Sequence, residues 1–249
     1  MNIPSQTAPF PQPGEGNNQE ENFLLRISGL SKNFGGVPAL QKVSFHVAPG
    51  QLTALIGPNG AGKTTLLNCL SGVLPPDQGV IWFNGTDLAG LPAHQVARLG
   101  IARTFQNLRL FPRLSVLDNV LCGLTVQAKD SLWQALLRPP GLRHQERRLK
   151  LLALEALDLF GLAGKMDLPA GVLPYGDKKR VELARAFVCQ PVLALLDEPV
   201  AGLNPEETAE IAGLLRLLRQ KGKTMLLVEH DMELVMGVAD NVVVLDGGR

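Results

Sequence analysis

The strongest chemical signal in the sequence is a glycine-rich segment that carries a lysine and two threonines. Residues 57–65 read GPNGAGKTT and contain the pattern G-x-x-x-x-G-K-T directly after the apolar run LTALI at 52–56. Glycines allow the backbone to turn tightly with its N–H groups pointing inward, and the N-terminus of a following helix adds the positive end of a dipole. Such an arrangement of donors suits a polyphosphate. The segment therefore predicts a phosphate-binding loop between a strand and a helix.

Two side chains of this loop have distinct expected roles. Lys63 would reach the β- and γ-phosphates as a point charge, and the Thr64 hydroxyl would be a ligand of Mg²⁺. The residues expected to surround the phosphates are Gly57, Pro58, Asn59, Gly60, Ala61, Gly62, Lys63, Thr64 and Thr65.

A pair of carboxylates follows a second apolar run. The sequence VLALLDEP at 192–199 contains Asp197 and Glu198 where the run ends. Ligands of open α/β folds bind at the carboxyl edge of the sheet, where Asp197 could hold Mg²⁺ and Glu198 could take a proton from an attacking water. Taken alone, Asp-Glu-Pro after a strand could be only a helix-capping turn. Its combination with the glycine loop favours the catalytic interpretation.

A third apolar run, TMLLV at 224–228, leads to His230. A lone histidine after a strand is usually structural. Beside a γ-phosphate, however, it would donate a hydrogen bond to the charge that develops during phosphoryl transfer.

These residues require strands that end near one another, and the pattern of the chain predicts them. Short β-type runs (FLLRIS, VSFHV, LTALI, VIWF, VLALL, TMLLV and NVVVL) alternate with helical stretches from residue 23 onward, which predicts an α/β fold. The nearly continuous apolar runs are typical of a parallel sheet that is covered on both faces. Between about residues 108 and 176 the strand signal disappears and helical periodicity replaces it. This block predicts a helical subdomain inserted into the sheet domain.

Composition limits the classes of function. With 24 Lys and Arg against 23 Asp and Glu, the net charge of +1 provides no overall field that would recruit nucleic acid or an acidic membrane. Three cysteines suggest neither a disulfide framework nor a zinc cluster, and a reducing cytosol fits best.

The first 22 residues are rich in Pro, Gln, Asn and Glu and lack the features of a signal peptide. We expect residues 1–22 to be a disordered extension. The apolar runs of the chain are far shorter than the roughly 20 residues that span a bilayer. If the protein works at a membrane, another chain must supply the crossing.

The motifs and their order resemble the ATP-binding cassette (ABC) ATPases over residues 23–249. The resemblance implies a P-loop NTPase (RecA-like) fold with a mostly parallel sheet core, an antiparallel β part and the inserted helical subdomain, and it implies ATP and Mg²⁺ as cofactors. It also implies that residues 57–64 are the Walker A loop, Asp197 the Walker B acid, Glu198 the catalytic base and His230 the switch histidine.

Two further residues obtain a role only from the resemblance. Gln106 in ARTFQN looks like the Q-loop glutamine, which in this family touches Mg²⁺ and couples to the membrane subunit, and Phe34 looks like the aromatic residue that stacks on adenine. As a lone aromatic residue, Phe34 would more often belong to a core. The expected catalytic set is Lys63, Gln106, Glu198 and His230. The expected metal ligands are Thr64, Gln106 and Asp197.

The stretch LPYGDKKRVELARAF at 173–187 occupies the position of the family signature, usually L-S-G-G-Q before a helix. In this family the signature closes over the γ-phosphate that the opposite subunit of a dimer holds. Here Pro174, Tyr175 and Asp177 replace the serine, the first glycine and the glutamine. Because proline offers neither a hydroxyl nor an N–H, we expect a weakened but not abolished contact with the partner's ATP, made by the Gly176 N–H and the helix N-terminus.

Another departure from the family pattern is Asn204 in AGLNP, where an aspartate is usual. The departures, together with GIARTF and RLFPRLSVLDNV, resemble the subfamily that powers bacterial uptake of branched-chain amino acids and related small amides. This implies an ATPase subunit on the cytoplasmic face of the inner membrane, with branched-chain amino acids favoured over urea or short amides as the transported solute.

The implied partners are a second ABC ATPase subunit, in a heterodimer or a homodimer, two transmembrane permease subunits and, indirectly, a substrate-binding protein. A soluble cassette ATPase acting on nucleic acid or ribosomes fits less well, since such chains commonly carry two cassettes or a long coiled coil. We expect no nucleic-acid partner. A regulator that never hydrolyses its nucleotide is disfavoured by Glu198 and His230.

Overall fold

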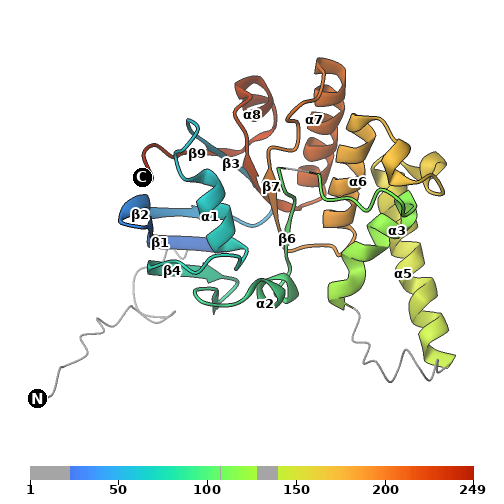
Figure 1. Cartoon of the computed structure of the whole chain (residues 1–249), viewed down its shortest axis with the longest axis horizontal. Coiled ribbons are helices and arrows are strands. Elements are labelled where there is room, and N and C mark those ends of the chain that lie inside the picture. The colour runs from blue at the N-terminus through green and yellow to red at the C-terminus, as the bar shows by residue number, and fades with distance from the viewer. Residues whose placement is uncertain (1–22, 107, 128–139) are drawn as a thin grey trace, which may run out of the picture.

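The computed structural model describes residues 23–106, 108–127 and 140–249. The predicted disordered extension at 1–22 lies outside the described residues. Figure 1 shows an antiparallel sheet at the left, a group of helices at the right, and the strands of a second sheet between them.

The central sheet is parallel and its strand order differs from the order in the chain. Val228 of one strand pairs with Asp197 on one side and with Leu55 on the other. The strands, in spatial order, are β6 (Ile101–Arg103), β7 (Leu193–Asp197), β8 (Thr224–Val228), β3 (Leu52–Ile56) and β9 (Asn241–Val244). Because all five run in one direction, their carboxyl ends meet at one edge of the sheet.

Alternate side chains of the buried strands enter two different hydrophobic clusters. Leu195 and Leu226 pack into the cluster beneath the antiparallel sheet. Leu196 and Leu227 pack into the cluster formed with the helices of the other side. The continuous apolar runs of the sequence are therefore explained by burial of both faces, as predicted.

The antiparallel sheet has four strands, and glycines form its first turn. Its strands, in spatial order, are β2 (Val37–Val47), β1 (Leu25–Phe34), β4 (Gln78–Phe83) and β5 (Thr86–Asp87). Gly35 and Gly36 join β1 to β2 with φ angles of 53° and 87°, a left-handed conformation that favours glycine.

Helices flank both sheets. The helices that lie close to the strands are α1 (Lys63–Leu70), α2 (Ala93–Arg98), α7 (Pro205–Gln220) and α8 (Met232–Val238). The α1 helix ends at Leu70, with Ser71 as its C-cap and Gly72 after it in a left-handed conformation.

The group of helices at the right of Figure 1 contains α3, α5 and α6 packed on one another. Its elements are α3 (Val116–Leu121), η1 (Cys122–Gln127), α5 (Pro140–Leu159), η2 (Ala163–Lys165), η3 (Ala170–Val172) and α6 (Tyr175–Phe187). The described part of the predicted subdomain, 108–176, is helical, and its boundaries remain a prediction. The α6 helix extends the group beyond residue 176 and joins it to the sheet, because Leu183 shares a hydrophobic cluster with Leu196.

Two short strands, β5 and β6, were not predicted. β6 has three residues and only Ile101 is fully buried, so it carries no apolar run that would reveal it. Its place depends instead on pairing with β7, since Ala102 lies opposite Ala194. Within the described residues, no helix is long and apolar enough to cross a membrane.

We expect Leu226→Ala to lower the free energy of unfolding by about 2–5 kcal/mol. Leu226 is completely buried in the middle strand of the parallel sheet, so its truncation leaves a cavity in the hydrophobic cluster that this sheet forms with the antiparallel sheet. Urea denaturation would measure the change.

The matched control is Leu151→Ala in α5, where the same atoms are removed from a side chain that is 60% exposed. Its effect should stay below about 1 kcal/mol. Equal losses in the two variants would contradict the assignment of the core.

Candidate functional site

The candidate site lies where four neighbouring parallel strands end. Gln106 follows β6, the acids Asp197 and Glu198 close β7, His230 follows β8, and the glycine loop follows β3. The order β6-β7-β8-β3 thus places the predicted residues along one edge, although they are up to 173 positions apart in the chain, from Gly57 to His230.

The glycine loop is packed so closely that side chains are excluded at two positions. A Cβ atom on Gly57 would lie 2.0 Å from the carbonyl oxygen of Leu245, and one on Gly62 would lie 2.5 Å from that of Ala39. Gly60, in contrast, faces open space, so its positive φ of 82° is the reason for glycine there. The loop is therefore fixed by close packing at Gly57 and Gly62, whereas Gly60 has open space beside it.

Lys63 begins the α1 helix and folds back over the loop. Its ammonium group donates to the carbonyl oxygens of Gly57 at 2.7 Å and Pro58 at 3.0 Å. Gly62 is the N-cap of the helix, so the N–H groups of the first turn, which includes Thr64 and Thr65, have no partners further back in the helix. The loop presents one cation and several backbone donors, which is the chemistry of an anion site.

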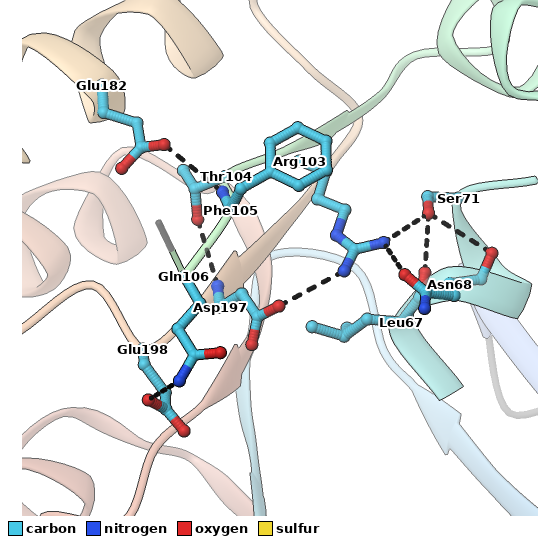
Figure 2. Close-up of polar contacts among 10 residues, drawn as sticks. All are labelled: Leu67, Asn68, Ser71, Arg103, Thr104, Phe105, Gln106, Glu182, Asp197 and Glu198. Carbon is cyan, nitrogen blue, oxygen red and sulfur yellow. Dashed lines mark hydrogen bonds and ion pairs between the residues drawn. The ribbon is translucent and has the colours of Figure 1, made fainter. Parts of the chain in front are cut away.

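Asp197 is a buried carboxylate that is held from two sides. Its backbone N–H donates to the Thr104 hydroxyl at 3.1 Å, and its Oδ2 accepts from the Arg103 guanidinium at 3.3 Å (Figure 2). Burial raises the pKa of Asp197 above its ordinary value, while the positive charge of Arg103 opposes this change. Thr104 thus fixes the backbone of Asp197, and Arg103 of the neighbouring strand orients its carboxylate.

Glu198 occupies a strained backbone position and contacts two other predicted residues. Its φ is 49°, unusual for a residue with a side chain, and its N–H donates to the Val228 carbonyl oxygen at 2.9 Å. Gln106 donates to its Oε2 at 3.0 Å (Figure 2), and His230 Nδ1 lies 4.0 Å from its Oε1. The structure therefore brings Gln106, Glu198 and His230 together.

His230 is mostly exposed, whereas the preceding Glu229 is fully buried. Glu229 accepts from the N–H of Val200 at 3.1 Å and from the N–H of His230 at 3.2 Å. Burial raises the pKa of Glu229, and the two N–H donors oppose the increase. This carboxyl group ties the end of β8 to the turn that follows Glu198.

Phe34 lies at the end of β1 with 49% of its surface exposed, and the Lys32 ammonium is 5.9 Å from the centre of its ring. It is accessible to a planar ligand and is not a core residue. Stacking on adenine remains a prediction.

The residues that replace the usual serine and glutamine of the signature have defined surroundings in the structure. Pro174 is the N-cap of α6 and provides no side-chain hydrogen bond. Asp177 is buried and forms ion pairs with Lys165 and with Arg180, the latter at 2.6 Å. It therefore holds the helix to the loop beside η2 and does not point into solvent.

Gly176 is the second residue of α6 and is buried. A Cβ atom there would lie 2.4 Å from Glu207 Oε1, so a larger residue would require the Glu207 side chain at the start of α7 to move. Asn204 caps α7 by accepting from the Glu207 N–H at 2.9 Å, a role that an aspartate could also fill. Contact between Gly176 and a partner's nucleotide remains a prediction.

Several residues that shape the site were not predicted as site residues. Lys179 of α6 is 1% exposed and donates to the Glu198 carbonyl oxygen at 3.3 Å. Glu182 of α6 is also buried and accepts from the Phe105 N–H at 3.4 Å. The others are Arg103, Thr104 and Glu229. The only local sign of these supporting residues is that Arg103 and Thr104 lie in the same short segment as Gln106. The remaining contacts depend on tertiary structure.

A groove of about 1220 Å³ runs beside the site, between α2 and β6 on one side and η1 and α6 on the other. Arg103 and Phe105, which precede Gln106, are among its lining residues.

Comparisons with known proteins agree with this geometry. The sequence profile of the ABC transporter family matches residues 40–201. The high-affinity branched-chain amino acid transport ATP-binding protein LivG of Escherichia coli K12 is 43% identical over 226 residues, which are 90% of this chain and 89% of LivG. The corresponding protein BraF of Pseudomonas aeruginosa is 41% identical over the same shares of both chains.

A crystal structure of a nucleotide-free ATP-binding cassette from an ABC transporter superposes with a TM-score of 0.78 at 32% identity, covering 91% of this chain and 88% of the other. A cassette in its ADP conformation gives the same values. On the agreement of sequence, fold and site, the chain belongs to the ABC transporter family, as an ATP-binding cassette.

Proposed function

We propose that this protein is the ATP-hydrolysing subunit of an ABC importer and that it supplies energy to separate transmembrane permease subunits. The observation that carries the proposal is the convergence of the glycine loop, Asp197 and the contact between Gln106 and Glu198 at one edge of the parallel sheet. The proposed reaction needs these parts together: a phosphate cradle, a metal-binding acid and a base that can reach water.

The residues present fit a hard divalent cation. Asp197 is nearly buried, and among the described residues only its Oδ2 has an ion-pair partner, which leaves Oδ1 for another ligand. Thr64 and Gln106 would complete the set with oxygen atoms, the ligand type that Mg²⁺ prefers. When bound, Mg²⁺ would neutralise charge on the phosphate oxygens.

Each of the other side chains of the site would have its own role in ATP binding or hydrolysis. Lys63 would offset charge on the β- and γ-phosphates, and Glu198 would accept a proton from the attacking water while Gln106 holds its carboxylate. His230, 4.0 Å from Glu198, would donate to the transferring phosphoryl group. Phe34 would stack on the adenine, a type of contact worth about 1–3 kcal/mol.

A second cassette would complete each nucleotide site through its signature. In this chain the N-terminus of α6, with Gly176, would face the partner's γ-phosphate. Pro174 provides neither donor of the usual serine, so this contact would be weaker than the one the partner offers in return. The asymmetry favours a heterodimer with two unequal sites.

The same assignment leads to proposals for the contact with the membrane subunits and for the transported solute. We place the contact with the permease at the groove that Phe105 lines, since it adjoins the segment carrying Gln106. The protein would then be a peripheral subunit on the cytoplasmic face of the membrane. The relatives LivG and BraF support branched-chain amino acids as the transported solute, which a substrate-binding protein would deliver to the permease.

We expect Glu198→Gln to retain ATP binding while kcat for hydrolysis falls by about 10²–10⁴-fold, the usual contribution of a general base. The amide keeps the shape of the side chain but cannot accept the proton. Phosphate release and calorimetry with ATP would measure the two quantities.

Glu155→Gln in α5 is the control, because it makes the same change at an exposed carboxylate. Its activity should equal that of the unmodified protein. Undiminished hydrolysis in Glu198→Gln would refute the base assignment.

Lys63→Ala should weaken the binding of ATP itself by roughly 10- to 150-fold, since a hydrogen bond to a charged group contributes about 1.5–3 kcal/mol. Calorimetry would give the dissociation constant, and Lys150→Ala, which removes an exposed lysine of α5, would serve as the control. A variant that binds ATP normally but does not hydrolyse it would contradict this role for Lys63.

The heterodimer can be tested by the mass of the ATP-bound complex purified from the native host. We expect one copy of this chain and one copy of a different cassette whose signature retains the serine. A complex that contains only this cassette type would reject the unequal pair while leaving the ATPase assignment intact.

A further inference from the structure

We propose that Arg103 is a positioning residue for Asp197, which it holds so that one carboxylate oxygen stays directed to the metal of the nucleotide site. The inference rests on the proposed function, because it assigns a role toward the Mg²⁺ that accompanies ATP. Arg103 lies outside the predicted site residues and is the last residue of β6, where it pairs with Leu195 of β7.

The Arg103 guanidinium joins three acceptors from two elements. Its Nη1 donates to Asn68 Oδ1 at 2.7 Å and to Ser71 Oγ at 2.9 Å, both at the C-terminal end of α1, and its Nη2 donates to Asp197 Oδ2 at 3.3 Å (Figure 2). The side chain is 7% exposed and that of Asp197 is 4% exposed. One cation thereby links the helix that follows the glycine loop to the acid at the end of β7.

The distances indicate which residue fixes the other. The two bonds to α1 are short, whereas the contact with Asp197 is longer than the 2.7–2.9 Å that is usual for a charge-assisted bond. The α1 helix therefore anchors the guanidinium, and the guanidinium in turn restrains the carboxylate. Only Oδ2 takes part, so the restraint leaves Oδ1 available.

Arginine is suited to this task because its planar fork can reach acceptors in two directions at once. The ring of Phe105, whose centre is 5.0 Å from the guanidinium carbon, adds a further contact to the group. A lysine at position 103 would retain the charge but would lose the simultaneous contacts with Asn68, Ser71 and Asp197. The positioning should therefore depend on more than charge.

Binding of a non-hydrolysable ATP analogue to the full-length chain, measured by calorimetry with Mg²⁺ and again with EDTA, provides the test. In Arg103→Met we expect the affinity in EDTA to stay within about two-fold of the unmodified protein, while the gain in affinity from Mg²⁺ falls by about ten-fold or more, as for other residues that orient metal ligands. Arg103→Lys should lie between the two proteins.

Two further variants keep the result decisive. Asn68→Ala removes an anchor of the guanidinium without touching Asp197, and it should reduce the Mg²⁺-dependent gain in the same direction even if Arg103→Met does not fold. Arg26→Met, at an exposed arginine of β1, should change neither measurement.

Equal weakening with and without Mg²⁺ would mean that Arg103 has only a structural role and would overturn the proposal. An unchanged Mg²⁺-dependent gain in both Arg103→Met and Asn68→Ala would overturn it as well. Failure of the unmodified, folded chain to bind the analogue at all would instead refute the proposed function, so the two failures are distinguishable.

Discussion

The burial of the Asp197 carboxylate at the end of β7 constrains how the neighbouring strand β6 must pair with β7. A buried acid is costly unless hydrogen bonds and an opposite charge compensate for the lost water, and the Asp197 carboxylate obtains both from the Arg103 guanidinium, while the Thr104 hydroxyl accepts from the backbone N–H of Asp197. Those partners are in place only if the short strand β6 pairs with β7 in the observed register, with Arg103 opposite Leu195. The same register brings Gln106 to Glu198, so the pairing that compensates the acid also brings together the residues of the candidate site.

The conformation of the glycine loop is fixed by close steric contacts, whereas Asp197 is held by a charged partner. Gly57 and Gly62 press against the carbonyl oxygens of Leu245 and Ala39, so the loop is fixed against the strand end of β9 on one side and the antiparallel sheet on the other. The N–H groups of the first turn of α1 have no partners within the helix, because the helix begins at Lys63. Phosphate oxygens would thus meet donors that need little rearrangement, which favours phosphoryl transfer.

The sequence was sufficient for those parts of the molecule that are determined locally. Apolar runs predicted β3, β7 and β8 because burial of both faces leaves a composition that is visible in a few residues. It was insufficient for β6, whose three residues form a strand only beside β7, and for Asp177, whose inward direction depends on Lys165 twelve positions earlier. The site residues expected from the family resemblance lie close together in space. Neighbours that hold them in place, such as Glu229, could not be predicted, because their contacts are tertiary and leave no spacing pattern in the sequence.

The helix that follows the signature stretch also contacts the candidate site of its own chain. The helix has Pro174 as its N-cap and begins with Tyr175, in place of the serine and the glycine that are usual in the signature, and its fifth residue, Lys179, donates to the carbonyl oxygen of Glu198. The Lys179 ammonium also lies 6.0 Å from the centre of the Tyr175 ring, and a Cβ atom on Gly202, in the turn after Glu198, would be 3.3 Å from that ring. The start of α6 is therefore packed against the chain's own turn after Glu198. The helix whose N-terminus is proposed to face a partner's nucleotide thus also contacts the backbone of the proposed base in its own chain.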